Sequence, residues 1–233
     1  MVGATGKTGS LVVEQLLDRG CHVRAVARSS ARLPAAVLGH PHLEVVEQVL
    51  LDASDEELAA CTEGCAAVVS CLGHVMDFHG MFGEPRQLCT DAAKRLCHSI
   101  SKHQPGKPVK FIMINSVGVA NAELGEQRTG LDRAVLFLLR RLLPPHRDNE
   151  CAAAFLAAEI GNTNAFVEWC SVRPDSLVDE SVSPYEICPS PVTGIFSGRP
   201  TARANVASFM ADLVLDEKLW GIWKYRMPVI MNE

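Results

Sequence analysis

Hydrophobic and polar positions alternate between two patterns along the first two thirds of the chain. Short apolar runs rich in β-branched residues predict buried strands, and stretches with apolar positions three or four apart predict helices between them. The expected strands are 21–27, 43–51, 66–72, 109–115 and 166–173, after a stub at Met1 and Val2. The expected helices are 7–19, 55–61, 85–102, 131–143 and 149–160. This alternation is typical of an α/β fold with a Rossmann-like, doubly wound parallel sheet.

The last third of the chain has a different pattern. Residues 174–200 are rich in proline and serine, and one amphipathic helix is then expected over 205–216. We therefore expect a single NAD(P)-binding domain over residues 1–233, in which about 174–233 form a small irregular C-terminal cap on the substrate side together with the last helix.

Composition narrows the class of protein. With 233 residues, of which 48% are hydrophobic and 21% charged, the chain suits one globular domain. The 22 basic and 27 acidic side chains give a net charge of −5, which argues against a general nucleic-acid surface. No apolar run approaches the roughly 18 residues of a membrane span. We expect a soluble protein with a small-molecule substrate, without nucleic-acid or membrane partners.

Cysteine usage and the start of the chain bear on the compartment. The nine cysteines form no CxxC pair and lie mostly in apolar segments, as free thiols do in a reducing environment. We expect a cytoplasmic protein. The two-residue stub before the first glycine is shorter than an ordinary strand of about five residues. This suggests that part of the first strand and an upstream targeting segment are missing, so an organelle is the alternative.

The segment Gly3-Ala4-Thr5-Gly6-Lys7-Thr8-Gly9 lies between the stub and an amphipathic helix. In such loops the first glycine allows a tight turn, the second lets the backbone approach a pyrophosphate, and the third lets helix and strand pack closely. The helix N-terminus points its partial positive charge at the phosphates. The residues expected to contact a dinucleotide here are Gly3, Thr5, Gly6, Lys7, Thr8 and Gly9. The alternative is a tight turn that binds nothing.

Three further segments are expected at the adenosine side of the dinucleotide. Arg28 follows the strand 21–27, where an acidic residue selects NAD and an arginine accommodates the extra phosphate of NADP. We therefore expect NADP rather than NAD, with Arg24, Arg32 and Ser29 as candidate supports. Ligands bind outside the carboxyl ends of parallel strands, which adds the residues that follow the next two strands. These are Asp52, Cys71, Leu72 and Gly73.

The chain resembles the atypical short-chain dehydrogenases/reductases, especially the NmrA-like and the biliverdin/flavin-reductase-like NAD(P)H-binding proteins. The resemblance rests on the loop GATGKTG at 3–9, on Arg28, on the strand end Ile-Asn-Ser-Val-Gly at 114–118, on the turn at 172–175 and on the helix at 205–210. It covers most of the chain. It implies the fold and the cofactor, but not a particular reaction.

In active members of this group, a serine at the end of the fifth strand orients a carbonyl, and a Tyr-x-x-x-Lys pair supplies the acid. Ser116 matches the serine, and we expect it to contact both cofactor and acceptor. The two tyrosines, Tyr185 and Tyr225, are followed four residues later by Pro189 and Val229, so the pair is absent. The resemblance therefore does not carry over ordinary alcohol dehydrogenase chemistry.

Where the group has its tyrosine, this chain has His146, followed four residues later by Glu150. A histidine can donate a proton, because its ordinary pKa lies near working pH. Ser116 and His146 are therefore the candidate catalytic residues. The alternative for His146 is a surface histidine just before a helix that Asp148 or Asn149 caps.

Other polar segments leave alternatives open. Arg173 and Asp175 follow the strand 166–173 and either contact substrate or form a structural turn. The glycine-flanked segment 73–83 either lines the substrate pocket or packs as a loop. We expect no metal, because His40, His42 and the cysteines at 61, 65 and 71 lack the neighbours of a four-coordinate site. The three tryptophans, Trp169, Trp220 and Trp223, are expected to pack the core.

Two functions follow from these features. The first is an NADPH-dependent oxidoreductase that acts on a small carbonyl, quinone-like or flavin-like acceptor, for which solvent can supply the proton. The second is a non-catalytic NADP(H)-binding protein, either a redox sensor or a structural subunit with protein partners. Turnover on a panel of acceptors discriminates between them.

Overall fold

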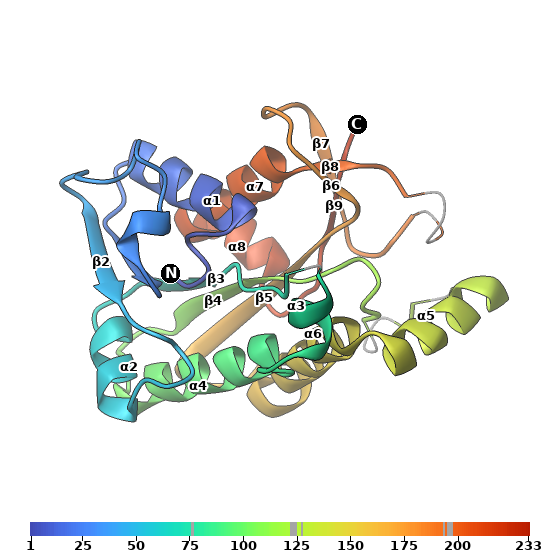
Figure 1. Cartoon of the computed structure of the whole chain (residues 1–233), viewed down its shortest axis with the longest axis horizontal. Helices are drawn as coiled ribbons and strands as arrows, with labels where there is room; N and C mark the ends of the chain where they lie inside the picture. Colours follow the sequence, from blue (N-terminus) through green and yellow to red (C-terminus); the bar gives the residue numbers. More distant parts are fainter. Residues whose placement is uncertain (76, 122–124, 127, 193, 195–197) are drawn as a thin grey trace.

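The computed structural model describes residues 1–75, 77–121, 125–126, 128–192, 194 and 198–233, and it confirms a Rossmann-like α/β fold (Figure 1). The first five strands are β1 (Val23–Ala27), β2 (Leu43–Glu47), β3 (Ala67–Ser70), β4 (Val109–Ile114) and β5 (Val167–Pro174). They pair in parallel in the orders β1-β2 and β3-β4-β5. Val2 joins the two groups, because it forms parallel bridges to Val26 and to Ser70.

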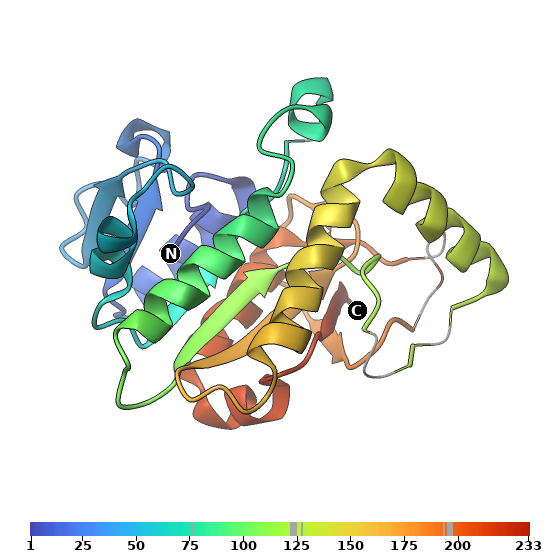
Figure 2. The ribbon, with the colours of Figure 1, turned by 90° about the horizontal axis from the view of Figure 1, so that it is seen from below.

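Helices cover both faces of this sheet (Figures 1 and 2). One face carries α1 (Lys7–Asp18), α7 (Arg203–Leu215) and α8 (Glu217–Trp223), and the other carries α2 (Asp55–Thr62), α4 (Leu88–Lys102) and α6 (Pro144–Phe155). The short α3 (Phe78–Phe82) and α5 (Gly130–Leu142) project from the body. A 3-10 turn, η1 (Ser30–Arg32), follows β1, and a π-helical turn, η2 (Leu156–Ile160), extends α6. Within the described part of the chain, no helix is long and apolar enough to span a bilayer.

The C-terminal third is more regular than its composition indicates. It forms β6 (Leu177–Val178), β7 (Tyr185–Cys188), β8 (Thr201–Ala202) and β9 (Val229–Asn232). β9 lies between β5, to which it is parallel, and β7, to which it is antiparallel. The main sheet therefore continues through the segment for which only an irregular cap and one helix are expected.

Two element boundaries differ from expectation in ways that matter for the site. β2 ends at Glu47 rather than at residue 51, because the chain turns there, with Asp52 N–H donating to the Val49 carbonyl. Helix α6 begins at Pro144 rather than at residue 149, since two consecutive prolines suit the first turn, where no intrahelical N–H is needed. His146 therefore lies in the first turn of α6, not before it.

Alternating residues of β4 explain why the strands are apolar on both faces. Phe111 is fully buried in the cluster that contains Leu96 of α4, while Ile112 is fully buried in the cluster that contains Val12 of α1 and Val206 of α7. The expected packing of the tryptophans is confirmed, since Trp169, Trp220 and Trp223 are all buried. The core thus lies on both sides of the sheet. The carboxyl ends of the strands lie outside it, where ligands bind in folds of this kind.

Candidate functional site

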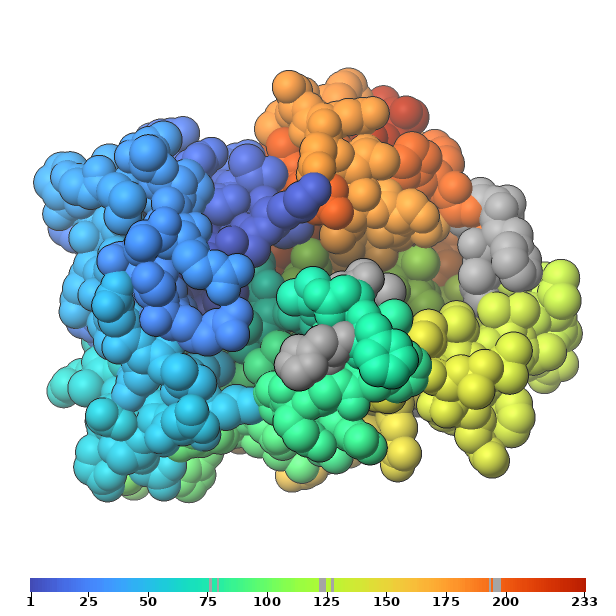
Figure 3. Space-filling model, viewed as in Figure 1, coloured from blue at the N-terminus to red at the C-terminus, as the bar shows by residue number. Residues whose placement is uncertain are grey.

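The residues expected to bind the dinucleotide lie at one edge of the sheet. The glycine loop follows Val2, Arg28 follows β1, Cys71 follows β3 and Ser116 follows β4. Because these strands are parallel, their carboxyl ends share this edge. In Figure 3 the green segment around residues 77–90 lies at the centre of the visible face, between the blue N-terminal part of the chain and the yellow α5.

The three loop glycines differ in what surrounds them. Gly3 has a φ of +75°, and a Cβ there would lie 2.5 Å from the Cys71 carbonyl carbon. A Cβ on Gly9 would lie 2.0 Å from the Gly3 carbonyl oxygen. Gly6 has an extended backbone, with φ −82° and ψ 162°, and its Cβ would meet only the Gly3 oxygen, at 3.4 Å. The protein itself therefore requires glycine at 3 and 9, whereas position 6 has room that a ligand can use.

The helix that follows the loop has no side chain at its N-terminus to satisfy its first amide groups. Gly6 is the N-cap of the 12-residue α1 and is exposed. Unpaired N–H groups at a helix start are the donors that a pyrophosphate accepts from. The open position 6 and the uncapped helix together fit a dinucleotide.

The other loop residues have distinct environments. Thr8 is buried and Thr5 is half-buried. The ammonium of Lys7 is exposed and lies 2.7 Å from Asp179, which also binds Arg203 of α7. The hydrogen bonds from Lys7 and Arg203 lower the pKa of Asp179. Lys7 therefore connects the glycine loop to the C-terminal third, and its contact with a cofactor stays a prediction.

At the adenosine side, Arg28 is exposed and has no hydrogen-bond partner in the part of the chain that the structure describes. Arg24 is not a support for it, contrary to expectation. The Arg24 guanidinium binds Glu44 at 2.8 Å and the carbonyl oxygens of Ala60 and Cys61 at the end of α2. It lies near the start of β1, and its Nε and Nη1 are already used, so Arg32 and Ser29 remain the candidate supports.

A carboxylate that the sequence did not indicate lies beside this position. Glu47, at the end of β2, is paired in register with Ala27 and accepts a hydrogen bond from Ser30 N–H at 2.6 Å. The hydrogen bonds from Ser30 lower the pKa of Glu47, which keeps the group ionised. It is 19 residues from Arg28 in the sequence, and only the pairing of β1 with β2 brings the two together.

Asp52 is exposed on the loop after β2, as expected for a residue near the adenine. The loop is held by Arg95 of α4, whose guanidinium donates to the carbonyl oxygens of Leu50, Leu51 and Ala53. Arg95 was not expected to contribute, because a helical arginine carries no signal of which loop it binds.

Cys71, Leu72 and Gly73 follow β3 beneath the glycine loop. Burial raises the pKa of the Cys71 thiol to about 12, so the side chain acts as an apolar group. Its backbone is the surface against which Gly3 packs. The Leu72 carbonyl accepts from the Cys89 thiol at 3.6 Å. All nine cysteines are free thiols.

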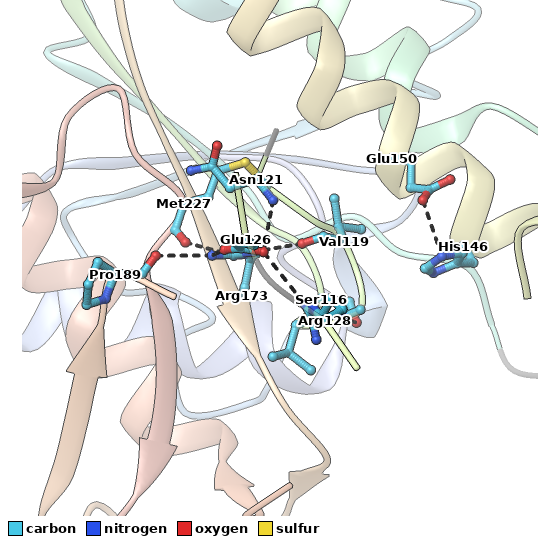
Figure 4. A network of polar contacts seen from close by, with 12 residues as sticks. Ser116, Val119, Asn121, Glu126, Arg128, His146, Glu150, Arg173, Pro189 and Met227 are labelled. Atoms are coloured by element: carbon cyan, nitrogen blue, oxygen red, sulfur yellow. Dashed lines mark hydrogen bonds and ion pairs between the residues drawn. The ribbon is translucent and has the colours of Figure 1, made fainter. Parts of the chain in front are cut away.

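Ser116 and His146 lie together at the end of β4, although 30 positions separate them in the sequence. A Cβ placed on Gly118 would lie 3.3 Å from His146 Cε1 and 3.6 Å from Ser116 Oγ. Ser116 Oγ accepts from Gly118 N–H at 3.2 Å, which leaves its own proton free to donate. His146 Nε2 is buried and makes no hydrogen bond within the described residues, and its one ion-pair contact there is with Glu150 (Figure 4).

The electrostatics of His146 follow from this burial. Burial lowers its pKa below the ordinary 6.5, and the carboxylate of Glu150, 3.5 Å from Nε2, only partly opposes the shift. Glu150 is itself bound by the Arg140 guanidinium through two hydrogen bonds of 2.6 and 2.7 Å. Glu150 thus stands where the Tyr-x-x-x-Lys pair has its lysine, and Arg140 of α5 neutralises its charge.

Asp148 does not cap the helix that carries His146, contrary to expectation. Its buried carboxylate accepts from the N–H groups of Cys89 and Thr90, the Thr90 hydroxyl and His74 Nε2. It therefore caps α4 and fixes the start of the segment 73–83, because the other ring nitrogen of His74 lies 3.1 Å from the Gly80 carbonyl oxygen.

His74, Cys89 and Asp148 are close enough to hold a metal ion, with their ligand atoms within 4.8 Å of one another. The four hydrogen bonds to the Asp148 carboxylate already account for this cluster. Of the segment 73–83, Met76 lies outside the described residues, and Phe78 is 79% exposed.

Arg173 is used within the protein, which favours the structural alternative for this residue. Its guanidinium is fully buried and binds Glu126 at 2.6 Å, as well as the carbonyl oxygens of Met227, Val119 and Pro189 (Figure 4). It joins β5 to three other segments. Asp175 accepts from Ser176 and stays a candidate.

Neither tyrosine replaces the missing acid. The Tyr185 hydroxyl binds Asp212 of α7, and the Tyr225 hydroxyl binds Glu168 near the start of β5, at the opposite edge of the sheet. Two surface cavities of about 650 and 550 Å³ also lie at that opposite edge, where Ala66 and Gly64 line both.

Comparisons with known proteins show the family and the fold of the chain. A sequence profile described as NAD(P)H-binding matches residues 3–217. An uncharacterized chloroplastic protein of Arabidopsis thaliana is 28% identical over 216 residues, which is 93% of this chain and 68% of that protein.

Two solved structures show the same fold. A short-chain dehydrogenase/reductase from Veillonella parvula, in complex with NADP, gives a TM-score of 0.71 at 15% identity, covering 99% of this chain and 92% of that chain. The anaerobillin reductase ChuY from Escherichia coli gives a TM-score of 0.68 at 16% identity, covering 99% and 95%.

Proposed function

Because the chain belongs to the NAD(P)H-binding family of atypical short-chain dehydrogenases/reductases, we propose that it is an NADPH-dependent oxidoreductase. Its acceptor is a small carbonyl, quinone-like or flavin-like compound. The observation that carries the proposal is that Ser116, whose proton is free to donate, and His146, whose Nε2 is buried, lie close to Gly118 at the carboxyl edge of the sheet. Both lie near the end of β4, at the edge of the sheet where we expect the glycine loop and Arg28 to hold a dinucleotide.

The roles of the residues follow from their surroundings. The amide groups at the start of α1 would bind the pyrophosphate, and Arg28, with Arg32, would bind the 2′-phosphate. When bound, NADPH would supply a hydride to the acceptor. Ser116 would donate its free proton in a hydrogen bond to the acceptor oxygen. Because burial keeps His146 mainly neutral, water supplies the proton at neutral pH, and His146 shapes the site.

A second candidate is a non-catalytic NADP(H)-binding sensor or subunit. The observation that favours it is Glu150, which replaces the lysine of the family pair and is held by Arg140. A binding protein needs the glycine loop but has no need of an acid.

The compartment is a separate question. The Arabidopsis relative is chloroplastic, which favours the organellar alternative over the cytoplasm for this chain. Fractionation of cells that express the full gene product discriminates between them.

Oxidation of NADPH, followed at 340 nm with a panel of quinones, flavins and aldehydes, tests the enzymatic proposal. We expect turnover on at least one acceptor, and we expect Ser116→Ala to lower it about tenfold or more with little change in cofactor affinity. Ser101→Ala, in the last turn of α4, is the matched control and should change neither. Tight cofactor binding with no turnover on any acceptor would favour the sensor or subunit.

A further inference from the structure

A buried guanidinium lies next to Ser116 with part of its hydrogen-bonding capacity unused. The side chain of Arg128 is only 7% exposed. Its Nη2 donates to the carbonyl oxygen of Val117, the residue after Ser116, at 2.6 Å. Its Nε is buried and has no hydrogen-bond partner. Figure 4 shows Arg128 beside Ser116, on the loop that leads from β4 to α5.

The charge of Arg128 is only partly compensated within the described residues. Two guanidinium groups, Arg173 and Arg128, share the single carboxylate of Glu126, so the described part of this cluster carries one net positive charge. Glu126 is committed to Arg173, which it contacts at 2.6 and 3.1 Å, and it also accepts from Asn121 N–H. Arg128 lies farther from it, at 3.7 Å. Among the described residues, no other carboxylate lies within 4 Å of Arg128.

A buried cation whose charge is only partly compensated is costly, and an anion that binds it recovers part of that cost. The planar fork of arginine suits a carboxylate, which can accept from two of its N–H groups at once. We propose that Arg128 binds an anionic oxygen group of the acceptor, so that the preferred acceptor carries a carboxylate or similar anion close to the carbonyl that meets Ser116. That the anion belongs to an acceptor rests on the proposed function; the anion site itself does not.

The anion could come from the acceptor or from the cofactor, since both carry anionic oxygens. The structure favours the acceptor, because Arg128 adjoins Ser116 at the end of β4, whereas the amide groups suited to a pyrophosphate lie at the start of α1. The test must therefore measure the binding of an acceptor-like anion and the binding of the cofactor separately.

Calorimetry with a matched pair of probes tests the anion site without turnover. 2-Naphthoate and 2-naphthamide have nearly the same shape and differ in charge, and each is titrated into the protein with and without NADP⁺. We expect the carboxylate to bind about ten- to a hundredfold more tightly than the amide, as for a hydrogen bond to a charged group. Arg128→Gln should abolish this difference, and Arg128→Lys should retain part of it.

The control is Arg133→Gln, which removes the same charge from an exposed position on α5 and should leave the preference unchanged. Thermal unfolding of each variant shows whether it is folded. If Arg128→Gln is not folded, the smaller carboxylate preference expected of Arg128→Lys tests the proposal instead. Equal affinity of the wild type for both probes, or a loss in Arg128→Gln of NADP⁺ affinity instead of carboxylate preference, would overturn the proposal.

Turnover separates this proposal from the function on which it rests. With 1,2-naphthoquinone-4-sulfonate and 1,2-naphthoquinone as acceptors, Arg128→Gln should raise KM about tenfold or more for the sulfonate only. If neither quinone nor any other acceptor is reduced, but Arg128 still selects 2-naphthoate in calorimetry, the proposed function is wrong and the anion site stands. A KM effect of the same size on both quinones counts against the anion site.

Discussion

Replacing Gly6 with valine should abolish dinucleotide binding and leave the domain folded. The backbone at Gly6 is extended and nothing in the protein crowds its missing Cβ, so the variant should unfold at nearly the wild-type temperature. The side chain would instead occupy the space in which the backbone approaches phosphate, and we expect affinity to fall at least about a hundredfold. Fluorescence titration with NADPH and thermal unfolding measure the two effects.

Gly9 provides the contrast, because its constraint is internal. Gly9→Ala would place a Cβ 2.0 Å from the Gly3 carbonyl oxygen, and overpacking of this kind costs about 1–3 kcal/mol or more. This variant should lose stability whether or not cofactor is present. If Gly6→Val bound NADPH normally, the glycine loop would not be the phosphate site.

Cofactor preference should depend on Arg28. A charge-assisted contact with the 2′-phosphate is worth about 1.5–3 kcal/mol, so the wild type should prefer NADP(H) over NAD(H) by about ten- to a hundredfold. Arg28→Asp should greatly reduce or invert that preference, since the introduced carboxylate and that of Glu47 would then both face the ribose. Calorimetry with both cofactors measures it.

Arg24→Gln is the control for Arg28. It removes the same charge, but from a side chain that binds Glu44 and the end of α2, so the ratio of the two affinities should not change. Equal wild-type affinities for NAD and NADP would contradict the assignment of Arg28.

The pH dependence of turnover reports the role of His146. Because burial lowers its pKa below 6.5, the imidazolium that could donate a proton forms only as the pH falls through that lower value. Wild type and His146→Asn should therefore differ less than about threefold in kcat at pH 8, and the kcat of the wild type should exceed that of the variant only as the pH falls below 6.5. A loss of more than about tenfold at pH 8 would make His146 essential in its neutral form.

At the scale of elements, helix α4 depends on a carboxylate from another helix. Asp148 accepts from two first-turn N–H groups of α4, those of Cys89 and Thr90, and from His74, so Asp148→Ala would leave these donors buried and unpaired. We expect a loss of about 2–4 kcal/mol in the free energy of unfolding, more than an exposed cap contributes. Urea unfolding measures it. Asp91→Ala, in the same turn, should cost less than about 1 kcal/mol.

The sequence predicts the elements whose signals are local. β3, β4 and β5 are apolar on both faces, and α1 follows a glycine loop, so each is recognisable from a short window. β7 and β9 are not, because they become strands only by pairing with each other and with β5. Four-residue strands in a segment rich in proline give no periodicity to detect.

The same distinction holds for the site. The glycine loop and Ser116 follow from spacing and resemblance, whereas Glu47, Asp148 and Arg128 depend on contacts across strands, helices or a folded loop. Arg173, whose role the sequence left open, is a polar residue at the expected edge of the sheet whose side chain is used within the protein. A residue type at the right position therefore indicates a candidate, and its partners decide its role.

For the molecule as a whole, Arg173 connects segments that are far apart in the chain. It joins β5 to the loop through Val119 and Glu126, to Pro189 and to Met227 before β9. Removing one partner of a buried ion pair costs about 3–5 kcal/mol, so Arg173→Met should lower the free energy of unfolding by that amount. Arg173→Met combined with Glu126→Leu should cost less than Arg173→Met alone, and urea unfolding of the two variants compares them.

The position of β9 has a consequence for biosynthesis. Residues 229–232 separate β5 from β7 in the finished sheet, so those two strands cannot be joined until nearly the whole described chain has been translated. Until then a nascent chain exposes the hydrogen-bonding edge of β5, a surface on which chains associate with one another. Folding of this protein on the ribosome must therefore stop short of completion, and chaperone occupancy should be greatest in the interval before the final strand emerges.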